Sequence, residues 1–103
     1  MPAYLVVDVA AVHDAGRYAR YRGEVTAGLE AAGGRYLVRG GALEVLEGDW
    51  RPGRLVVVEF PSTAAAKRWW GSPDYASLRQ LRQQSTTTHM LVVEGAAPGV
   101  TGP

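Results

Sequence analysis

The residues best suited to acid–base chemistry are Asp8 and His89. Asp8 lies near the end of an apolar run at residues 3–10, and His89 lies near the start of another at residues 86–94. If these runs are neighbouring antiparallel strands, directly opposed side chains share a face of the sheet. A carboxylate beside an imidazole fixes its tautomer and favours its charged form, which would provide a general acid or base. The alternative is that Asp8 caps a turn or pairs with an arginine while His89 packs in its strand.

Arg39 and Tyr18 are the next candidates for a catalytic role. Arg39 directly precedes Gly40-Gly41. Glycines let the backbone approach a ligand closely, and an arginine there would hold a carboxylate or an enolate oxygen. Tyr18 lies on an apolar helical stripe, from which its phenol would donate a hydrogen bond or a proton to a substrate. The alternatives are a surface arginine at a bend and a tyrosine that belongs to the core.

Aromatic side chains provide the candidates for substrate binding. Trp69 and Trp70 are adjacent and therefore point about 100° apart on a helix, so one of them is expected to line a cleft or an interface. Trp50 lies in a predicted turn at residues 49–53. Tryptophan and tyrosine are enriched at protein interfaces, so a subunit interface and a ligand pocket remain equal alternatives. The predicted substrate-binding residues are Tyr21, Trp50, Trp69, Trp70 and Tyr75.

Composition excludes several classes of function. The 103 residues include 11 basic and 10 acidic side chains, so a net charge of +1 gives no reason to expect nucleic acid or a membrane as partner. The absence of cysteine removes disulfides, thiolate nucleophiles and sulfur-ligated metals. We expect no cofactor: no metal, flavin or nucleotide. The N-terminus lacks the pattern of a secretory signal, and we expect a cytoplasmic protein.

Hydrophobic periodicity predicts a small α+β domain over residues 1–95 with a disordered tail at 96–103. Strands are predicted at residues 3–10, 54–60 and 86–94. A further strand is predicted at residues 35–38 and 42–47, interrupted by Gly40-Gly41. The first helix begins at the N-cap Asp14 and ends at Gly33-Gly34, and its stripe is Tyr18, Tyr21, Val25, Leu29 and Ala32. A second helix begins after Ser62, stops at Gly71 and restarts at Ser72-Pro73.

The order β-α-β-β-α-β is the split βαβ arrangement of ferredoxin-like folds. In this arrangement residues 3–10 form a central strand between residues 54–60 and 86–94, antiparallel to both. The helices cover one face of the antiparallel sheet. The runs at residues 3–10 and 54–60 are apolar on both faces, so the other face also needs cover. A second copy of the chain would cover it in a symmetric homodimer.

Several segments resemble a bacterial family known as a domain of unknown function, number 1330. They are YLVVDV, DAGRYARYR, AAGGRYLVRGG, VLEGDWRPGRLVVVEFPS and WWGSPDYASLRQLR. The resemblance covers about residues 3–94. It implies membership of the dimeric α+β barrel superfamily, and it implies no particular reaction. One departure is Asp14-Ala15-Gly16, where the family typically has Asp-Pro.

The resulting hypothesis is a cofactor-independent enzyme with a pocket between sheet and helices. The substrate would be a small apolar or aromatic molecule that carries a carbonyl or carboxylate, such as a polyketide-like biosynthetic intermediate. The feasible chemistry is proton transfer, in the form of cyclisation, dehydration, isomerisation or lactone formation. His89 and Asp8 would be the base, Arg39 the oxyanion holder and Tyr18 the proton donor. The alternatives are a non-catalytic ligand-binding or stress-response dimer and a cofactor-free monooxygenase.

Overall fold

A computed structural model describes residues 1–97 and 99. It contains a four-stranded sheet in the order β2-β3-β1-β4, in which every neighbouring pair is antiparallel. This order confirms the ferredoxin-like prediction, with the first strand central. Most of the predicted tail lies outside the described residues. The elements are β1 (Ala3–Val12), α1 (Ala15–Ala31), β2 (Arg35–Arg39), β3 (Arg54–Phe60), α2 (Thr63–Trp70), α3 (Pro73–Ser85) and β4 (Thr86–Glu94).

The helices begin and end where the sequence predicts. The Asp14 side chain accepts a hydrogen bond from the backbone N–H of Arg17 at 3.0 Å, which caps α1. Ser62 and Ser72 cap α2 and α3 in the same way. The break at Gly71 between α2 and α3 is also confirmed.

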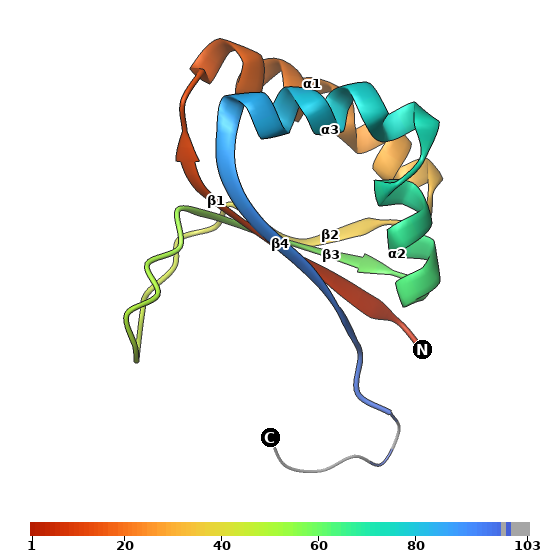
Figure 1. The fold of residues 1–103 in the computed structure, drawn as a ribbon. Coiled ribbons are helices and arrows are strands. Elements are labelled where there is room, and N and C mark those ends of the chain that lie inside the picture. The colour runs from red at the N-terminus through yellow and green to blue at the C-terminus, as the bar shows by residue number, and fades with distance from the viewer. Residues whose placement is uncertain (98, 100–103) are drawn as a thin grey trace.

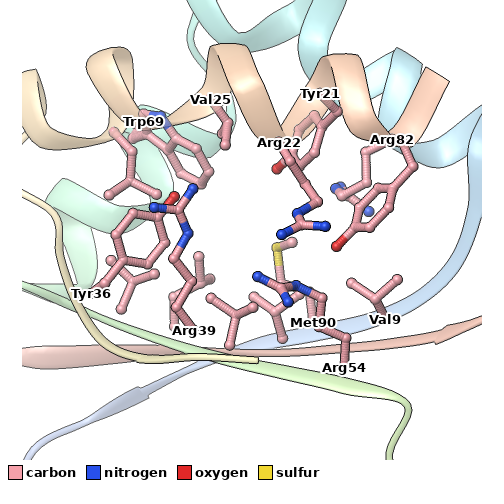
Figure 2. A pocket seen from close by; sticks show the side chains of 16 residues that line it. Val9, Tyr21, Arg22, Val25, Tyr36, Arg39, Arg54, Trp69, Arg82 and Met90 are labelled. Atoms are coloured by element: carbon pink, nitrogen blue, oxygen red, sulfur yellow. The ribbon is translucent and has the colours of Figure 1, made fainter. Parts of the chain in front are cut away.

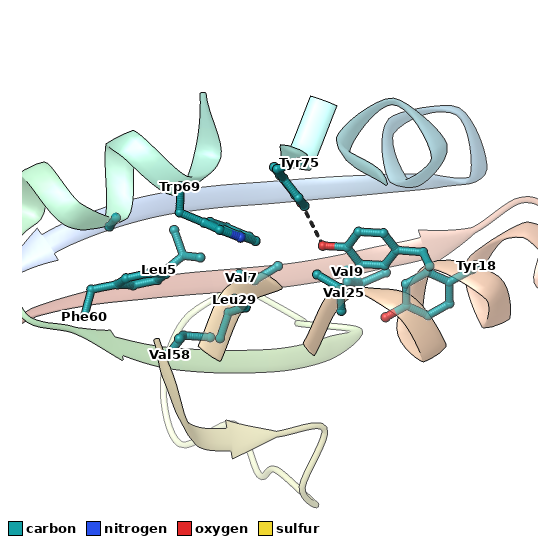
Figure 3. Close-up of a cluster of buried hydrophobic side chains, with 12 residues drawn as sticks. Leu5, Val7, Val9, Tyr18, Val25, Leu29, Val58, Phe60, Trp69 and Tyr75 are labelled. Atoms are coloured by element: carbon teal, nitrogen blue, oxygen red, sulfur yellow. Dashed lines mark hydrogen bonds between the residues drawn. The ribbon is translucent and has the colours of Figure 1, made fainter. Parts of the chain in front are cut away.

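All three helices lie on one side of the sheet (Figure 1). The alternating side chains Leu5, Val7 and Val9 of β1 point toward the helices and are buried there. The helical stripe predicted on α1 meets them, since Tyr18, Tyr21, Val25 and Leu29 are its buried residues. The core between these layers is drawn in Figure 3.

Residues 42–47 do not form the predicted continuation of a strand. β2 ends at Arg39, and Gly40 follows with a positive φ of 71°. Residues 41–53, which we call the arm, then project away from the sheet on the side opposite the helices (Figure 1). The prediction was wrong because alternation of apolar residues does not make a strand without a partner to pair with, and β3 begins only at Arg54.

Asp8 fixes the base of this arm. Its carboxylate accepts hydrogen bonds from the Trp50 indole N–H and from the backbone N–H of Gly53, both at 2.9 Å. A Cβ on Gly53 would lie 2.2 Å from the carbonyl oxygen of Val9, so only glycine lets the arm approach β1 this closely. Asp8 is 4% exposed, and it therefore has a structural role at the sheet.

We expect Asp8→Ala to lower the free energy of unfolding by about 2–4 kcal/mol, because it leaves two donors without their charged acceptor. Urea denaturation measures this loss. The matched control is Asp49→Ala in the same arm, where an exposed side chain should change the free energy by less than about 0.5 kcal/mol. Equal losses in the two variants would contradict the role assigned to Asp8.

Candidate functional site

A pocket lies between α1 and the helix-facing side of the sheet. The inward-facing valines of β1 and β3, with Leu5 and Leu29, form its apolar floor and wall. Trp69 of α2 and Met90 of β4 complete the apolar lining. The cavity has a volume of about 50 Å³, which suits a ligand of few heavy atoms. Its position between helices and sheet matches the predicted place of a ligand pocket.

The charged lining of this pocket is cationic. Four arginines reach it from four different elements, and among the described residues no aspartate or glutamate lines it. Figure 2 shows Arg39 at one end, beside Tyr36 and Trp69. Toward the other end, the same view shows the remaining three, Arg22 of α1, Arg54 of β3 and Arg82 of α3.

Arg82 differs from the other three arginines because it is only 5% exposed. Its Nε donates to the Tyr75 hydroxyl at 3.4 Å, and among the described residues it has no carboxylate partner. No fully buried side-chain polar atom in that part of the chain lacks a hydrogen-bond partner. The terminal nitrogens of Arg82, for which no bond is found there, are therefore not fully buried, and Arg82 is one of the residues that line the pocket.

Arg39 is held in place without a carboxylate. Its guanidinium lies over the Tyr36 ring, 4.4 Å from the ring centroid. One terminal nitrogen also donates to the Thr26 hydroxyl at 3.2 Å, and that hydroxyl bonds the Tyr36 hydroxyl at 3.2 Å. A cation over an aromatic face keeps its charge while it gains orientation. Arg39 therefore retains donors for an anion.

Arg54 lies across the backbone of Gly40. A Cβ built at Gly40 would overlap the Arg54 guanidinium, so the glycine leaves room for this side chain. A larger residue at position 40 would displace the flexible end of Arg54 from this place, so Gly40 makes room for an arginine rather than for the ligand predicted from the sequence. The positive φ of 71° at Gly40 adds a second reason for glycine there.

Two tyrosines, Tyr21 of α1 and Tyr75 of α3, connect the pocket to the first turn of α3. The hydroxyls of Tyr21 and Tyr75 are 2.8 Å apart, which is the contact dashed at Tyr75 in Figure 3. Burial is the main cause that raises the pKa of Tyr21, and the neighbouring Tyr75 raises it further, while the Arg82 charge opposes this. The raised pKa keeps Tyr21 protonated, so its hydroxyl can donate or accept a hydrogen bond.

The structure brings together some of the predicted site residues. Arg39, Tyr18, Tyr21 and Trp69 all line the pocket. Tyr75 lies behind it, with its ring centroid 4.1 Å from that of Trp69.

Other predicted site residues lie elsewhere. Asp8 and His89 are opposed in the register of β1 and β4, as predicted, but on the face away from the helices. The pocket contains neither, and the carboxylate of Asp8 is occupied by the arm. Their catalytic role stays a prediction. Trp50 also lies on that face, and Trp70 is 42% exposed and stacks against Arg79.

Sequence reasoning missed Arg22, Arg54, Arg82 and Tyr36 as pocket residues. Arg22 lies off the apolar stripe of its helix, yet its guanidinium is 5.9 Å from the Tyr18 ring centroid at the pocket. Two of the others had a signal in the sequence. Arg82 falls on the apolar stripe of its helix, and Arg54 shares strand parity with Val56 and Val58. A charged residue on an otherwise apolar, buried stripe is a pattern that indicates a functional site.

A model of the family DUF1330, a domain of unknown function, matches residues 2–96. The chain belongs to the DUF1330 family. This confirms the resemblance seen in the sequence. No protein with a curated description matches the chain.

Two solved structures share the fold of this DUF1330 chain. One is methylated RPA0582, with 20% identity and a TM-score of 0.76, over 96% of this chain and 84% of that one. The other is RPA0582 of Rhodopseudomonas palustris, described as a protein of unknown function. It has 21% identity and a TM-score of 0.75, over 94% of this chain and 84% of its own. At this identity the likeness shows the fold alone.

Membrane-spanning helices and metal clusters can be assessed for the described residues of this family member. Within them, no helix is both long enough and apolar enough to cross a membrane. The same residues contain no group of three or more histidine, aspartate or glutamate side chains placed to hold a metal ion. The donors that do converge in the pocket are guanidinium and phenol groups, which suit an anionic organic ligand.

The protonated Tyr21 makes stability depend on alkaline pH. The folded-state pKa of Tyr21 is raised above its ordinary value of 10.0, so the stability that protonated Tyr21 contributes to the fold is fully present below pH 10.0. As pH rises further, the unfolded chain loses the proton first and stability falls by up to about 1.4 kcal/mol per pH unit. We expect the Tyr21→Phe variant to lose the part of this pH dependence of the unfolding free energy that comes from Tyr21.

Urea denaturation of both proteins at a series of pH values above 10 measures the difference in slope. The other four tyrosines remain in both proteins and therefore act as the internal control. Parallel curves for the two proteins would show that Tyr21 titrates normally, which would contradict its burial beside Tyr75.

Proposed function

We propose that the pocket binds a small organic anion, with a carboxylate or enolate oxygen held at Arg82 and a short apolar body against the valines. The observation that carries this proposal is the burial of the Arg82 charge without a carboxylate. A buried charge costs several kcal/mol unless a counter-charge and hydrogen bonds compensate for it. An anionic ligand would supply both.

The distribution of arginine partners supports this proposal. Arg17, Arg20 and Arg35 lie outside the pocket, and each forms an ion pair with an acidic side chain of this chain. The pocket arginines form none among the described residues. A guanidinium presents a planar fork of donors that matches a carboxylate. Three further arginines, Arg51, Arg68 and Arg79, lie outside the pocket and also lack an ion pair in that part of the chain, so the support comes from the convergence of four unpaired arginines on one cavity.

The apolar lining supports the second half of the proposal. Val56, Val58 and Leu29 present only hydrocarbon to the cavity, and Trp69 adds an aromatic ring. An apolar ligand body has no donor or acceptor that could be buried there without a partner. A short hydrocarbon chain with an acidic end fits both parts of the lining and the small volume of the cavity.

A cofactor-independent proton-transfer enzyme is the second candidate function. Phenols beside arginines favour it, because both stabilise negative charge that develops on an enolate oxygen. In this proposal Tyr18 is the proton donor and Arg39 and Arg82 hold the oxyanion, for cyclisation, isomerisation, dehydration or lactone formation. Hydrogen–deuterium exchange beside the carbonyl of a bound acid tests this role. Unchanged exchange in Tyr18→Phe would remove Tyr18 from it.

We also propose that a second copy of the chain covers the other face of the sheet, as in the dimeric α+β barrel superfamily. This face carries exposed apolar side chains, with Leu91 57% and Val93 49% exposed on β4. In the pairing of β4 with β1, Leu91 lies opposite Val6 and Val93 lies opposite Tyr4. Burial of such a surface is the usual driving force of subunit association. Light scattering that gives the mass of a single chain would refute this.

The binding proposal predicts that Arg82→Met separates binding from stability. Isothermal titration with pentanoate should show at least about tenfold weaker binding, since a hydrogen bond to a charged group contributes about 1.5–3 kcal/mol. The free energy of unfolding without ligand should be unchanged or higher, because an unpaired buried charge is replaced by an apolar side chain of similar length.

The matched control is Arg20→Gln, which removes a positive charge from the exposed side of α1. It should leave the affinity for pentanoate within about twofold, since exposed charges are screened. Two results would contradict the proposal: equal binding by Arg82→Met and the unaltered protein, or no measurable binding of pentanoate by the unaltered protein.

A further inference from the structure

We infer that the ligand of this pocket carries two anionic groups, held at opposite ends of the cavity. This inference rests on the proposed function and narrows its ligand class from organic anions to short dianions, such as dicarboxylates. It follows from the number of arginines, their separation into two sets and the absence of acidic side chains that would balance them.

The charge balance is the first step. Four guanidinium groups line one cavity, and no aspartate or glutamate of the part of the chain that the structure describes lines it. Like charges held close together repel one another, most strongly where water is scarce. A ligand with one negative charge would offset only part of the repulsion among the four arginines, whereas a ligand with two negative charges would offset more of it.

The separation of the arginines is the second step. Arg22, Arg54 and Arg82 lie toward the end of the pocket near Val9 and Met90 (Figure 2). This set, which we call the deep site, includes the buried guanidinium of Arg82. It would hold the first anionic group.

Arg39 forms a second site at the other end of the cavity. It lies there beside Tyr36 and Trp69 (Figure 2), oriented by the ring of Tyr36 and the hydroxyl of Thr26. The ring and the hydroxyl together hold this exposed guanidinium in place at the cavity. Holding the guanidinium in advance reduces the entropy lost when it binds an anion.

The apolar wall between the two sites defines the rest of the ligand. Val25 of α1 and Val56 and Val58 of β3 line the cavity together with these arginines. The small volume of about 50 Å³ leaves room for only a few heavy atoms there. A short hydrocarbon spacer between two acidic groups suits this volume, whereas an aromatic ring would exceed it.

The test compares acids that differ only in the second carboxylate. Succinate, glutarate and adipate are each paired with the alkanoate of equal carbon number. Isothermal titration should show at least one dianion that binds about tenfold or more tightly than its partner, because a second charge-assisted contact contributes about 1.5–3 kcal/mol. The preferred chain length reports the distance between the sites.

Variants of the pocket arginines test which arginine holds each anionic group of the ligand. Arg39→Gln should reduce the dianion preference to less than about threefold and leave the monoanions nearly unaffected, while Arg39→Lys retains part of the preference. Arg82→Met should weaken mono- and dianions alike. Arg20→Gln, outside the pocket, should change neither affinity nor preference.

The possible outcomes separate this inference from the proposal beneath it. Equal affinity for every matched pair would overturn the inference and leave the pocket as a site for monoanions. A dianion preference that survives Arg39→Gln unchanged would also overturn it, because the second group would then lie elsewhere. Failure of all six acids to bind would overturn both.

Discussion

The Arg82 guanidinium, buried without a carboxylate, is the constraint on which the pocket depends. Its position on α3 requires Tyr75 as a hydrogen-bond acceptor, and Tyr75 in turn contacts the Tyr21 hydroxyl on α1. This chain of polar contacts joins two helices across an otherwise apolar layer. It orients the positive charge toward the cavity and gives it no acidic partner among the described residues. Stability alone would favour an apolar residue at this position, so the charge is best explained by a ligand.

The two faces of the sheet have different roles, and strand alternation separates them. Odd-numbered residues of β1, such as Val7, face the helices and the cavity. Asp8 faces the other way and fixes the arm through Trp50 and Gly53. The one buried carboxylate of the central strand is therefore kept out of a pocket whose cationic character it would have neutralised.

Periodicity and helix caps predicted almost all of the fold, because local rules and the tertiary structure agree in β1, α1, β3 and β4. They failed at residues 42–47, where pairing with another strand was needed and is absent. For the site, the sequence identified Arg39, Tyr18, Tyr21 and Trp69. It could not show that Asp8 is committed to the arm, since that contact joins residues 42 positions apart. Nor could it bring Arg22, Arg54 and Arg82 together from three elements.

The most direct test of an anion site at Arg82 is an NMR titration of the arginine Nε–H signals with sodium succinate at constant ionic strength. The Arg82 signal is assigned from its absence in the Arg82→Met spectrum. An anion held at Arg82 should make this signal shift and saturate, whereas the signal of Arg68, on the exposed side of α2, should move little. An Arg82 signal that stays fixed throughout the titration, or one that moves only as much as that of Arg68, would contradict it.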